Sequence, residues 1–164
     1  MSKSNATERF LHAAADLGLS IEVREFPEGT RTAVDAARAI GCEVGQIVKS
    51  LVFVAGRDRP FLALTSGPNR ADTGRLSELQ GGAPVRQATA DEAREATGYA
   101  IGGTPPFGHP RPLTVFMDRA LLGYDEVWAA AGTPRSVFPI APDDLLRVTN
   151  ARPEEFTQRS PAGR

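Results

Sequence analysis

The sequence is poor in several features that define common protein classes. It has a single cysteine, Cys42, which excludes an internal disulfide and any metal site built from a cysteine cluster. No apolar stretch reaches the roughly 18 residues that a membrane-spanning helix needs, and the N-terminus lacks the hydrophobic region of a signal peptide. A formal net charge of −1 gives no general attraction to polyanions. From these absences we expect a cytoplasmic protein with no membrane segment and no need for a metal ion or another cofactor.

Length and composition are those of an ordinary globular domain. With 164 residues, 41% of them apolar and 24% charged, the chain can bury one hydrophobic core. We predict a single domain over residues 1–150. The remaining residues, 151–164, are rich in arginine, proline and glutamate and are predicted to form a flexible tail.

Lysine is scarce in this chain. Of the 19 basic residues only Lys3 and Lys49 are lysines, so the other 17 are arginines. Lys49 stands in the most apolar stretch, Gly45 to Gly56, whose β-branched residues and terminal glycines predict a buried strand. An ammonium group removed from water without a partner is strongly destabilising. Lys49 therefore either extends to a sheet edge or faces a polar cavity that holds an anion or acceptor groups.

Local patterns predict five helices and seven strands. Capping residues and apolar periodicity predict helices from Asn5 to Leu17, from Thr32 to Gly41, around Leu76 and Leu79, from Thr89 to Gly98, and from Asp143 to Val148. Apolar runs predict strands at 20–26, 45–56, 61–65, 85–88, 113–118, 126–131 and 137–140, and the second and third read as an antiparallel hairpin. Because short strands alternate irregularly with helices, we predict an α+β fold with a mixed, largely antiparallel, barrel-like β-sheet flanked by helices.

A segment rich in glycine and proline, Gly98 to Pro112, precedes the strand at 113–118. Glycine lets the backbone adopt positive φ and approach a ligand closely, while the pair Pro105-Pro106 stiffens the segment. Successive N–H groups in such a loop suit an anion or a developing oxyanion. The loop lacks the Gly-Lys-Ser/Thr ending of a P-loop, and a strand rather than a helix follows it, which excludes a dinucleotide fingerprint. The pattern alone leaves a ligand-binding loop and a rigid connection equally open.

Other residues carry weaker signals. His109 ends the glycine-rich segment, where it is either a substrate contact or an ordinary turn residue. Asp118 ends a predicted strand and either points into a site or caps the next turn. Trp128 fits the core. The chain has no G-x-S-x-G elbow, and its two histidines do not have metal-ligand spacing.

Two separated motifs together resemble the YbaK/ProX family of editing domains, which deacylate mischarged tRNA. The family has a lysine in an apolar strand and a G-x-x-x-G-G-x-x-P loop. Here the strand reads I-V-K-S-L-V-F around Lys49, and the loop is matched by Gly98, Gly102, Gly103 and Pro106. The similarity runs from about Thr32 to Thr149. Members of the family occur as free-standing proteins and as insertions in bacterial prolyl-tRNA synthetases.

The resemblance implies hydrolysis of the ester between an amino acid and the terminal adenosine of tRNA. Lys49 would anchor the substrate, and the main chain of Gly98, Gly102 and Gly103 would position the carbonyl and a water; these four are the predicted catalytic residues. The predicted substrate-binding residues are Phe26, Thr32, Ser50, Asn69, Thr104, Pro105, Pro106, His109 and Asp118. The implied partners are the 3′ aminoacyl-adenosine end of tRNA and, as a candidate, prolyl-tRNA synthetase.

Three functions stay open at this point. The favoured one is a trans-acting deacylase for tRNA-Pro that carries a small non-cognate amino acid. The alternative is a non-catalytic module of the same fold that binds tRNA or a synthetase. A third is an enzyme that hydrolyses a small activated acyl ester. Some family members use a downstream histidine where this chain has Thr133 and Pro134, so the resemblance does not identify the amino acid.

Overall fold

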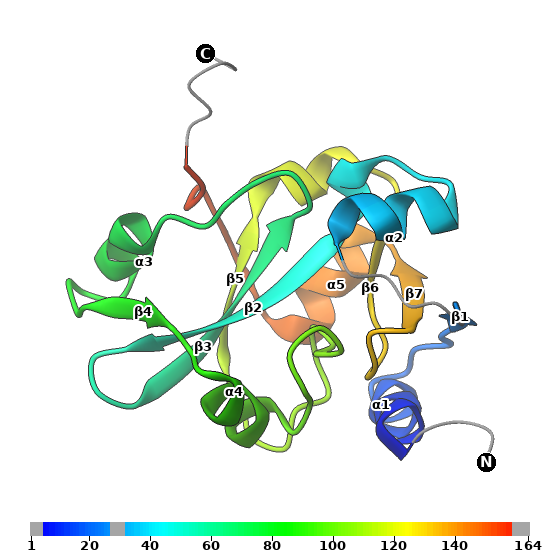
Figure 1. Ribbon diagram of the computed structural model, residues 1–164, viewed down its shortest axis with the longest axis horizontal. Helices are drawn as coiled ribbons and strands as arrows, with labels where there is room; N and C mark the ends of the chain where they lie inside the picture. Colours follow the sequence, from blue (N-terminus) through cyan, green and yellow to red (C-terminus); the bar gives the residue numbers. More distant parts are fainter. Residues whose placement is uncertain (1–4, 27–31, 159–164) are drawn as a thin grey trace.

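The computed structural model describes residues 5–26 and 32–158. Within these ranges the chain forms five α-helices and eight strands in two sheets (Figure 1). The helices are α1 (Asn5–Asp16), α2 (Ala33–Ile40), α3 (Thr73–Leu79), α4 (Ala90–Thr97) and α5 (Pro142–Thr149), with 3-10 turns η1 (Val44–Gln46) and η2 (Arg119–Gly123). The strands are β1 (Arg24–Glu25), β2 (Val48–Ala55), β3 (Arg59–Ser66), β4 (Val85–Gln87), β5 (Thr114–Asp118), β6 (Val127–Ala130), β7 (Ser136–Ile140) and β8 (Arg152–Glu154). No helix in the described ranges is long and apolar enough to cross a membrane.

The larger sheet is built on the β2–β3 hairpin, which crosses the molecule with its turn pointing away from the smaller sheet (Figure 1). The strand order is β4-β2-β3-β5-β8. The predicted antiparallel hairpin is confirmed, with Lys49 opposite Thr65. β5 pairs in parallel with both of its neighbours, β3 and β8. A parallel pairing needs a long crossover, and the chain from 67 to 113 provides it.

The smaller sheet has the order β1-β7-β6 and is antiparallel. A single parallel bridge between Ile47 and Trp128 connects it to the start of β2. The two sheets otherwise stay separate and neither closes on itself in the described ranges, so the α+β class is confirmed but the barrel-like expectation is wrong. β4 pairs only with the far end of β2, at Phe53–Ala55, and the bridge at Ile47 is at the other end, so the edge of β2 between them at Lys49 forms no strand pairing with any described residue.

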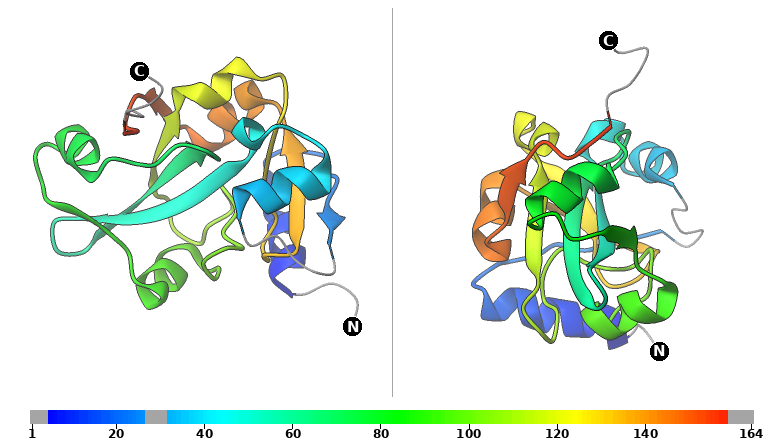
Figure 2. Two further views of the ribbon diagram at one scale, coloured as in Figure 1. Left: turned by 45° about the horizontal axis from the view of Figure 1, so that its top comes forward. Right: turned by 90° about the vertical axis from the view of Figure 1, so that its left-hand side faces the viewer.

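Alternation along the hairpin divides the core between the two faces of the large sheet. On one face, Val48, Val52 and Val54 join a cluster with α1, α5 and the small sheet. On the other face, Phe53 and Phe61 pack with Phe116 and α3. A third cluster lies between α2 and the two sheets, where the helix covers Ile47, Trp128 and Val137 (Figures 1 and 2).

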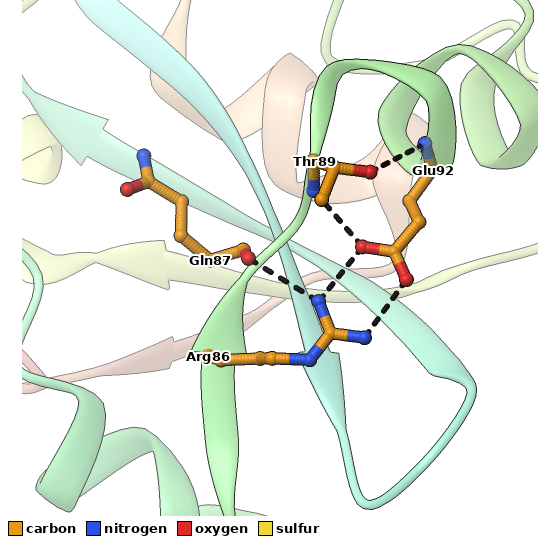
Figure 3. Close-up of polar contacts among 4 residues, drawn as sticks. All are labelled: Arg86, Gln87, Thr89 and Glu92. Carbon is orange, nitrogen blue, oxygen red and sulfur yellow. Dashed lines mark hydrogen bonds and ion pairs between the residues drawn. The ribbon is translucent and has the colours of Figure 1, made fainter.

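Helix ends follow the local sequence closely. Thr32 caps α2 by accepting a hydrogen bond from Asp35 N, and Gly41 ends the helix with φ of +90°. α4 begins with a reciprocal capping box between Thr89 and Glu92 (Figure 3). The Glu92 carboxylate also accepts two hydrogen bonds from the guanidinium of Arg86 in β4, at 2.7 and 2.8 Å, so the helix is tied to the sheet (Figure 3). α4 leads into the glycine-rich segment, and its fixed start helps to place that segment.

The two ends of the domain differ from expectation. The strand predicted at 20–26 is reduced to Arg24–Glu25, because Ile21 and Val23 pack against the main core without pairing. The tail predicted from residue 151 instead adds β8 beside β5, and Phe156 is completely buried. The sequence of this segment is polar, but it is held by the buried Phe156, by pairing with β5, and by main-chain hydrogen bonds with Arg70 and Asp72. Residues 159–164 lie outside the described ranges.

Candidate active site

A cavity of about 510 Å³ opens at the unpaired edge of β2. It lies between the start of that strand, the first turn of α2, the loop 101–104 and the strands β6 and β7. Lys49 is the only ionisable side chain among the described residues that line it. The lining comprises Thr32, Ala33, Val34, Ala36, Ile47, Val48, Lys49, Ser50, Leu51, Gly67, Ile101, Gly102, Thr104, Trp128, Ala129, Ala130 and Val137.

Lys49 is half-buried in the cavity wall, and its ammonium donates a hydrogen bond of 2.6 Å to the main-chain oxygen of Asn69. Burial lowers the pKa of this ammonium below its ordinary value of 10.5, the nearby Arg70 lowers it further, and Asp118 opposes the shift. One acceptor leaves two of the three N–H groups of the ammonium available to a ligand. Of the two alternatives posed by the sequence, the structure shows the cavity.

Ser50 supplies a second polar group to the same wall. Its Oγ is buried and, within the described part of the chain, has no hydrogen-bond partner. A buried hydroxyl without a partner destabilises a protein by about 1–3 kcal/mol. Such a cost at the wall of a cavity is relieved when a ligand provides a donor or an acceptor.

The loop on the opposite side brings Gly102 and Thr104 to the cavity. Gly102 has φ of +91°, a conformation that favours glycine, and an added Cβ would lie 3.7 Å from Pro134. Thr104 is buried and its hydroxyl donates to Ala100 O at 3.1 Å, which braces the turn. Lys49, Ser50, Thr32, Gly102 and Thr104 are thus the predicted site residues that the structure brings together.

Two of the predicted catalytic glycines lie away from the cavity wall. Gly98 ends α4 in the left-handed conformation, where its N–H donates to Arg94 O and its carbonyl accepts from Arg9. The N–H of Gly103 donates to Ala100 O. A Cβ on Gly103 would approach Thr133 Cα to 2.7 Å, so glycine is required there by close backbone contact. Both residues shape the loop, and of the three glycines predicted to be catalytic Gly102 is the one that lines the cavity.

Other predicted substrate contacts also lie elsewhere. Pro106 and His109 line a different cavity, of about 930 Å³, beside α1 and the end of α5. The His109 Nε2 is 2.8 Å from Pro105 O, and burial lowers the pKa of its imidazole despite this hydrogen bond. Phe26 is partly buried and packs in the cluster under α2, behind the cavity wall.

Asn69 and Asp118 lie behind Lys49 rather than in the lining of the cavity. The Asn69 amide donates to Asp118 Oδ2 at 2.9 Å, and its main-chain oxygen accepts the ammonium of Lys49. Asp118 is only 4% exposed. These two predicted substrate-binding residues therefore contact the lysine or each other.

Sequence reasoning missed the apolar part of the site. Trp128, predicted as core, is buried but also lines the cavity, and the guanidinium of Arg24 lies 4.8 Å from its ring centroid. Val34 and Ile101 line it as well, with 49% and 58% of their surfaces exposed. Nothing in the local pattern separates these from ordinary core or surface residues, because their role depends on strands and loops far apart in the sequence.

Comparison with known proteins identifies this architecture. Residues 27–148 match the model of the aminoacyl-tRNA editing domain. The chain belongs to this editing-domain family. The match confirms the resemblance to YbaK/ProX proteins that the two sequence motifs indicate.

Relatives of the editing domain resemble the chain over most of its length. This chain is 32% identical over 124 residues to "Uncharacterized protein YwhH" of Bacillus subtilis, and the alignment covers 76% of this chain and 78% of that protein. It is 27% identical over 134 residues to "Putative Cys-tRNA(Pro)/Cys-tRNA(Cys) deacylase EbsC" of Enterococcus faecalis, covering 82% of each. A solved structure described as "a putative trans-editing enzyme for prolyl tRNA synthetase" superposes with a TM-score of 0.91 at 50% identity, covering 96% of this chain and all of that one.

Proposed function

We propose that this editing domain is a trans-acting aminoacyl-tRNA deacylase. Its substrate would be a tRNA, with tRNA-Pro as the carrier, that bears a small non-cognate amino acid. The observation that carries the proposal is the meeting of Lys49 with Gly102 at one 510 Å³ cavity. The names of the deacylase-like relative and of the trans-editing structural neighbour support it.

The proposed chemistry is hydrolysis of an activated ester. A water attacks the ester carbonyl, the bond to the ribose oxygen breaks, and the products are a free amino acid and a tRNA with its hydroxyl restored. The Lys49 ammonium anchors a phosphate or carbonyl oxygen of the substrate through its two remaining N–H groups. The main chain at Gly102 would stabilise the developing oxyanion.

Among the described residues that line the cavity, no side chain is suited to act as a strong base or as an activated nucleophile. Its described polar side chains besides Lys49 are hydroxyls, those of Thr32, Ser50 and Thr104, and its one ionisable group is a cation. The reaction therefore depends on positioning and on oxyanion stabilisation, with a ribose hydroxyl of the substrate helping to activate the water.

Selection of the amino acid is assigned to the apolar walls. Ala129, Ala130 and Val48 form part of these walls, and Ser50 adds a single unpaired hydroxyl. A small pocket rejects bulky side chains by steric exclusion but separates similar small ones by only about 10–200-fold. We therefore propose small amino acids as a class. The protein would act in the cytoplasm, alone or with prolyl-tRNA synthetase.

The test is release of amino acid from a panel of mischarged tRNAs. Wild type is compared with Lys49→Ala and with the matched control Lys3→Ala, which changes the only other lysine of the sequence. We expect wild type and the control to hydrolyse at least one small-residue tRNA well above background, and Lys49→Ala to be at least about 100-fold slower, a typical cost of removing one group that stabilises the transition state. A wild-type protein that hydrolyses no tRNA faster than background would contradict the proposal.

A second candidate is a binding module without catalysis. The observation in its favour is that the described lining contains one ionisable group, Lys49, and no general base. The same panel separates the two functions. Tight binding of tRNA that is unchanged in Lys49→Ala, without any turnover by wild type, would favour the binding module.

A further inference from the structure

Asp118 is the only acidic or basic residue among the described ones that is buried, with 4% of its surface exposed. No lysine or arginine in the described ranges forms an ion pair with it. Its carboxylate instead accepts three hydrogen bonds: Oδ2 accepts from Ser66 N at 3.0 Å and Asn69 Nδ2 at 2.9 Å, and Oδ1 accepts from Ala120 N at 3.0 Å. A buried carboxylate held only by neutral donors is costly, which calls for an explanation of its position.

The three donors lie at the carboxyl ends of two neighbouring parallel strands. Ala120 follows β5, whereas Ser66 ends β3 and Asn69 lies in the turn that follows it. That turn is closed by Asn69 N donating to Ser66 O at 2.9 Å, and Ser66 Oγ fixes it to Gly45 O at 2.7 Å. Asp118 therefore anchors the turn after β3 to the end of the neighbouring strand.

The same turn carries the acceptor of the lysine. Asn69 binds Asp118 through its side-chain amide and binds the Lys49 ammonium through its main-chain oxygen, at 2.6 Å. One residue thus connects a buried carboxylate to the cation in the cavity wall. Asp118 itself is absent from the described lining, so it does not reach a ligand in the cavity.

We propose that Asp118 is a positioning residue, whose carboxylate fixes Asn69 so that the Asn69 carbonyl holds the Lys49 ammonium at the cavity. The contribution of Asp118 to catalysis rests on the proposed deacylase function. Its effect on the position of the Lys49 ammonium does not depend on a substrate. It also replaces the sequence-based expectation that Asp118 touches the substrate.

The two charged groups near Lys49 shift its pKa in opposite directions. The charged groups that face it are Arg70, which lowers the pKa of the ammonium, and Asp118, which raises it. Removal of the Asp118 charge leaves burial and Arg70 unopposed. We therefore expect the pKa of Lys49 to fall in Asp118→Asn.

The first experiment measures the lysine directly. Because the sequence has two lysines, labelling lysine with ¹³C gives two side-chain NMR signals, which Lys49→Ala assigns. The pKa of Lys49 is then titrated in wild type, Asp118→Asn, Asn69→Ala and the matched control Asp72→Asn. Asp72 caps α3 by accepting hydrogen bonds from Gly74 N and Arg75 N, so its change to an amide tests the substitution itself.

We expect a lower pKa of Lys49 in Asp118→Asn and in Asn69→Ala, and no change in Asp72→Asn. Asn69→Ala retains the main-chain carbonyl, so its effect reports the loss of orientation alone. Should Asp118→Asn fail to fold, the half-buried Asn69→Ala decides the question. An unchanged pKa of Lys49 in folded Asp118→Asn, or in Asn69→Ala when the first variant is unfolded, overturns the proposal.

The second experiment is a double-mutant cycle on deacylation. The cycle combines Asp118→Asn with Asn69→Ala. We expect each single variant to lose about tenfold or more in kcat/KM, as for the loss of a hydrogen bond to a charged group. The double variant should lose no more than Asp118→Asn alone. Losses that multiply would show independent roles and overturn the proposal. If wild type has no deacylase activity but the pKa of Lys49 moves as expected, the deacylase function fails while the positioning role stands.

Discussion

Lys49 shows how a single residue can be costly to the fold and useful to a site. Its ammonium is half-buried, its pKa is lowered first by burial, and one hydrogen bond to Asn69 O offsets part of the cost. Removal of such a charge from an apolar strand is often neutral or stabilising, provided that shape is kept. The residue is thus better explained by a ligand than by stability.

The first prediction concerns Lys49→Met, which keeps an unbranched side chain without charge. We expect loss of deacylation with a free energy of unfolding that is unchanged or higher, because the desolvated ammonium is removed. Urea denaturation measures the stability. The hydrogen bond to Asn69 O that is lost involves a charged group and is worth about 1.5–3 kcal/mol, so a loss of stability above about 3 kcal/mol would contradict this account.

The pH dependence of this effect has a definite sign. Because the pKa of the ammonium is lower in the folded than in the unfolded state, the cost of its charge is fully present below the folded pKa. It is relieved as the pH rises from the folded pKa toward the ordinary value of 10.5. The advantage of Lys49→Met over wild type should therefore shrink across that alkaline range, and wild-type activity should fall there as Lys49 loses its proton.

The second prediction concerns Gly102, with Gly81 as its matched control. Both have positive φ, of +91° and +73°, and a Cβ has room at each. Alanine at either position should cost about 1 kcal/mol through backbone strain. Only Gly102 lines the cavity, so Gly102→Ala should lower kcat/KM while Gly81→Ala should not. Equal activity of the two variants, alongside equal losses in thermal stability, would remove Gly102 from the site.

At the scale of elements, α4 depends on the Glu92 carboxylate. Hydrogen bonds from Arg86, followed by the main-chain hydrogen bond from Thr89, lower the pKa of Glu92 from 4.5 to about 2 (Figure 3). The group is exposed, so its contribution is screened by solvent. The stabilisation by the ionised Glu92 carboxylate is nevertheless present in full above the ordinary pKa of 4.5, which the group has in the unfolded state.

The third prediction follows from this shift. Glu92→Gln should lower the melting temperature at neutral pH, and the difference from wild type should disappear as the pH falls from about 4.5 to about 2. Thermal unfolding followed by circular dichroism over this range measures it. Glu95→Gln, in the same helix, serves as the control. A difference between Glu92→Gln and wild type that does not change with pH would exclude the ionised carboxylate as its cause.

Elements governed by neighbouring residues were predictable from the sequence, and those governed by distant ones were not. Thr32, Gly41 and Thr89 mark helix ends because a cap is satisfied within one turn. The strand pairing of β8 depends on a free edge of β5, which no local pattern reveals. The expected barrel was wrong for the same reason, since the division of the strands into two sheets depends on pairings between strands that are distant in the sequence.

The site divides in the same way. Lys49 and Gly102 could be found because a charge in an apolar run and a cluster of glycines are local anomalies. Val34 and Trp128 could not be found, because they become lining residues only when α2 and β6 meet the edge of β2. The contact of Asn69 with Lys49 likewise requires the β2–β3 register.

At the scale of the whole molecule, the fourth prediction concerns the C-terminal segment. Phe156 is completely buried in the cluster of Phe53, Phe61 and Phe116. Phe156→Ala should lower the free energy of unfolding by about 3–5 kcal/mol, as expected for an aromatic residue removed from a core. Equilibrium unfolding in urea gives the value.

A pair of truncations tests the same segment as a whole. A chain that ends after Asn150 loses both β8 and Phe156 and should be destabilised by at least as much. A chain that ends after Gln158 keeps both and should match wild type. Equal stability of the two truncated chains would show that β8 contributes nothing to the fold.

The position of β5 between β3 and β8 has a consequence during synthesis on the ribosome. β3 gains its second neighbour only when β5 has been made, and β5 gains its second neighbour only with β8 and Phe156. Contacts so distant in sequence form late and slow the folding of a domain. The nascent polypeptide should therefore gain its compact, protease-resistant form only after Phe156 has left the exit tunnel.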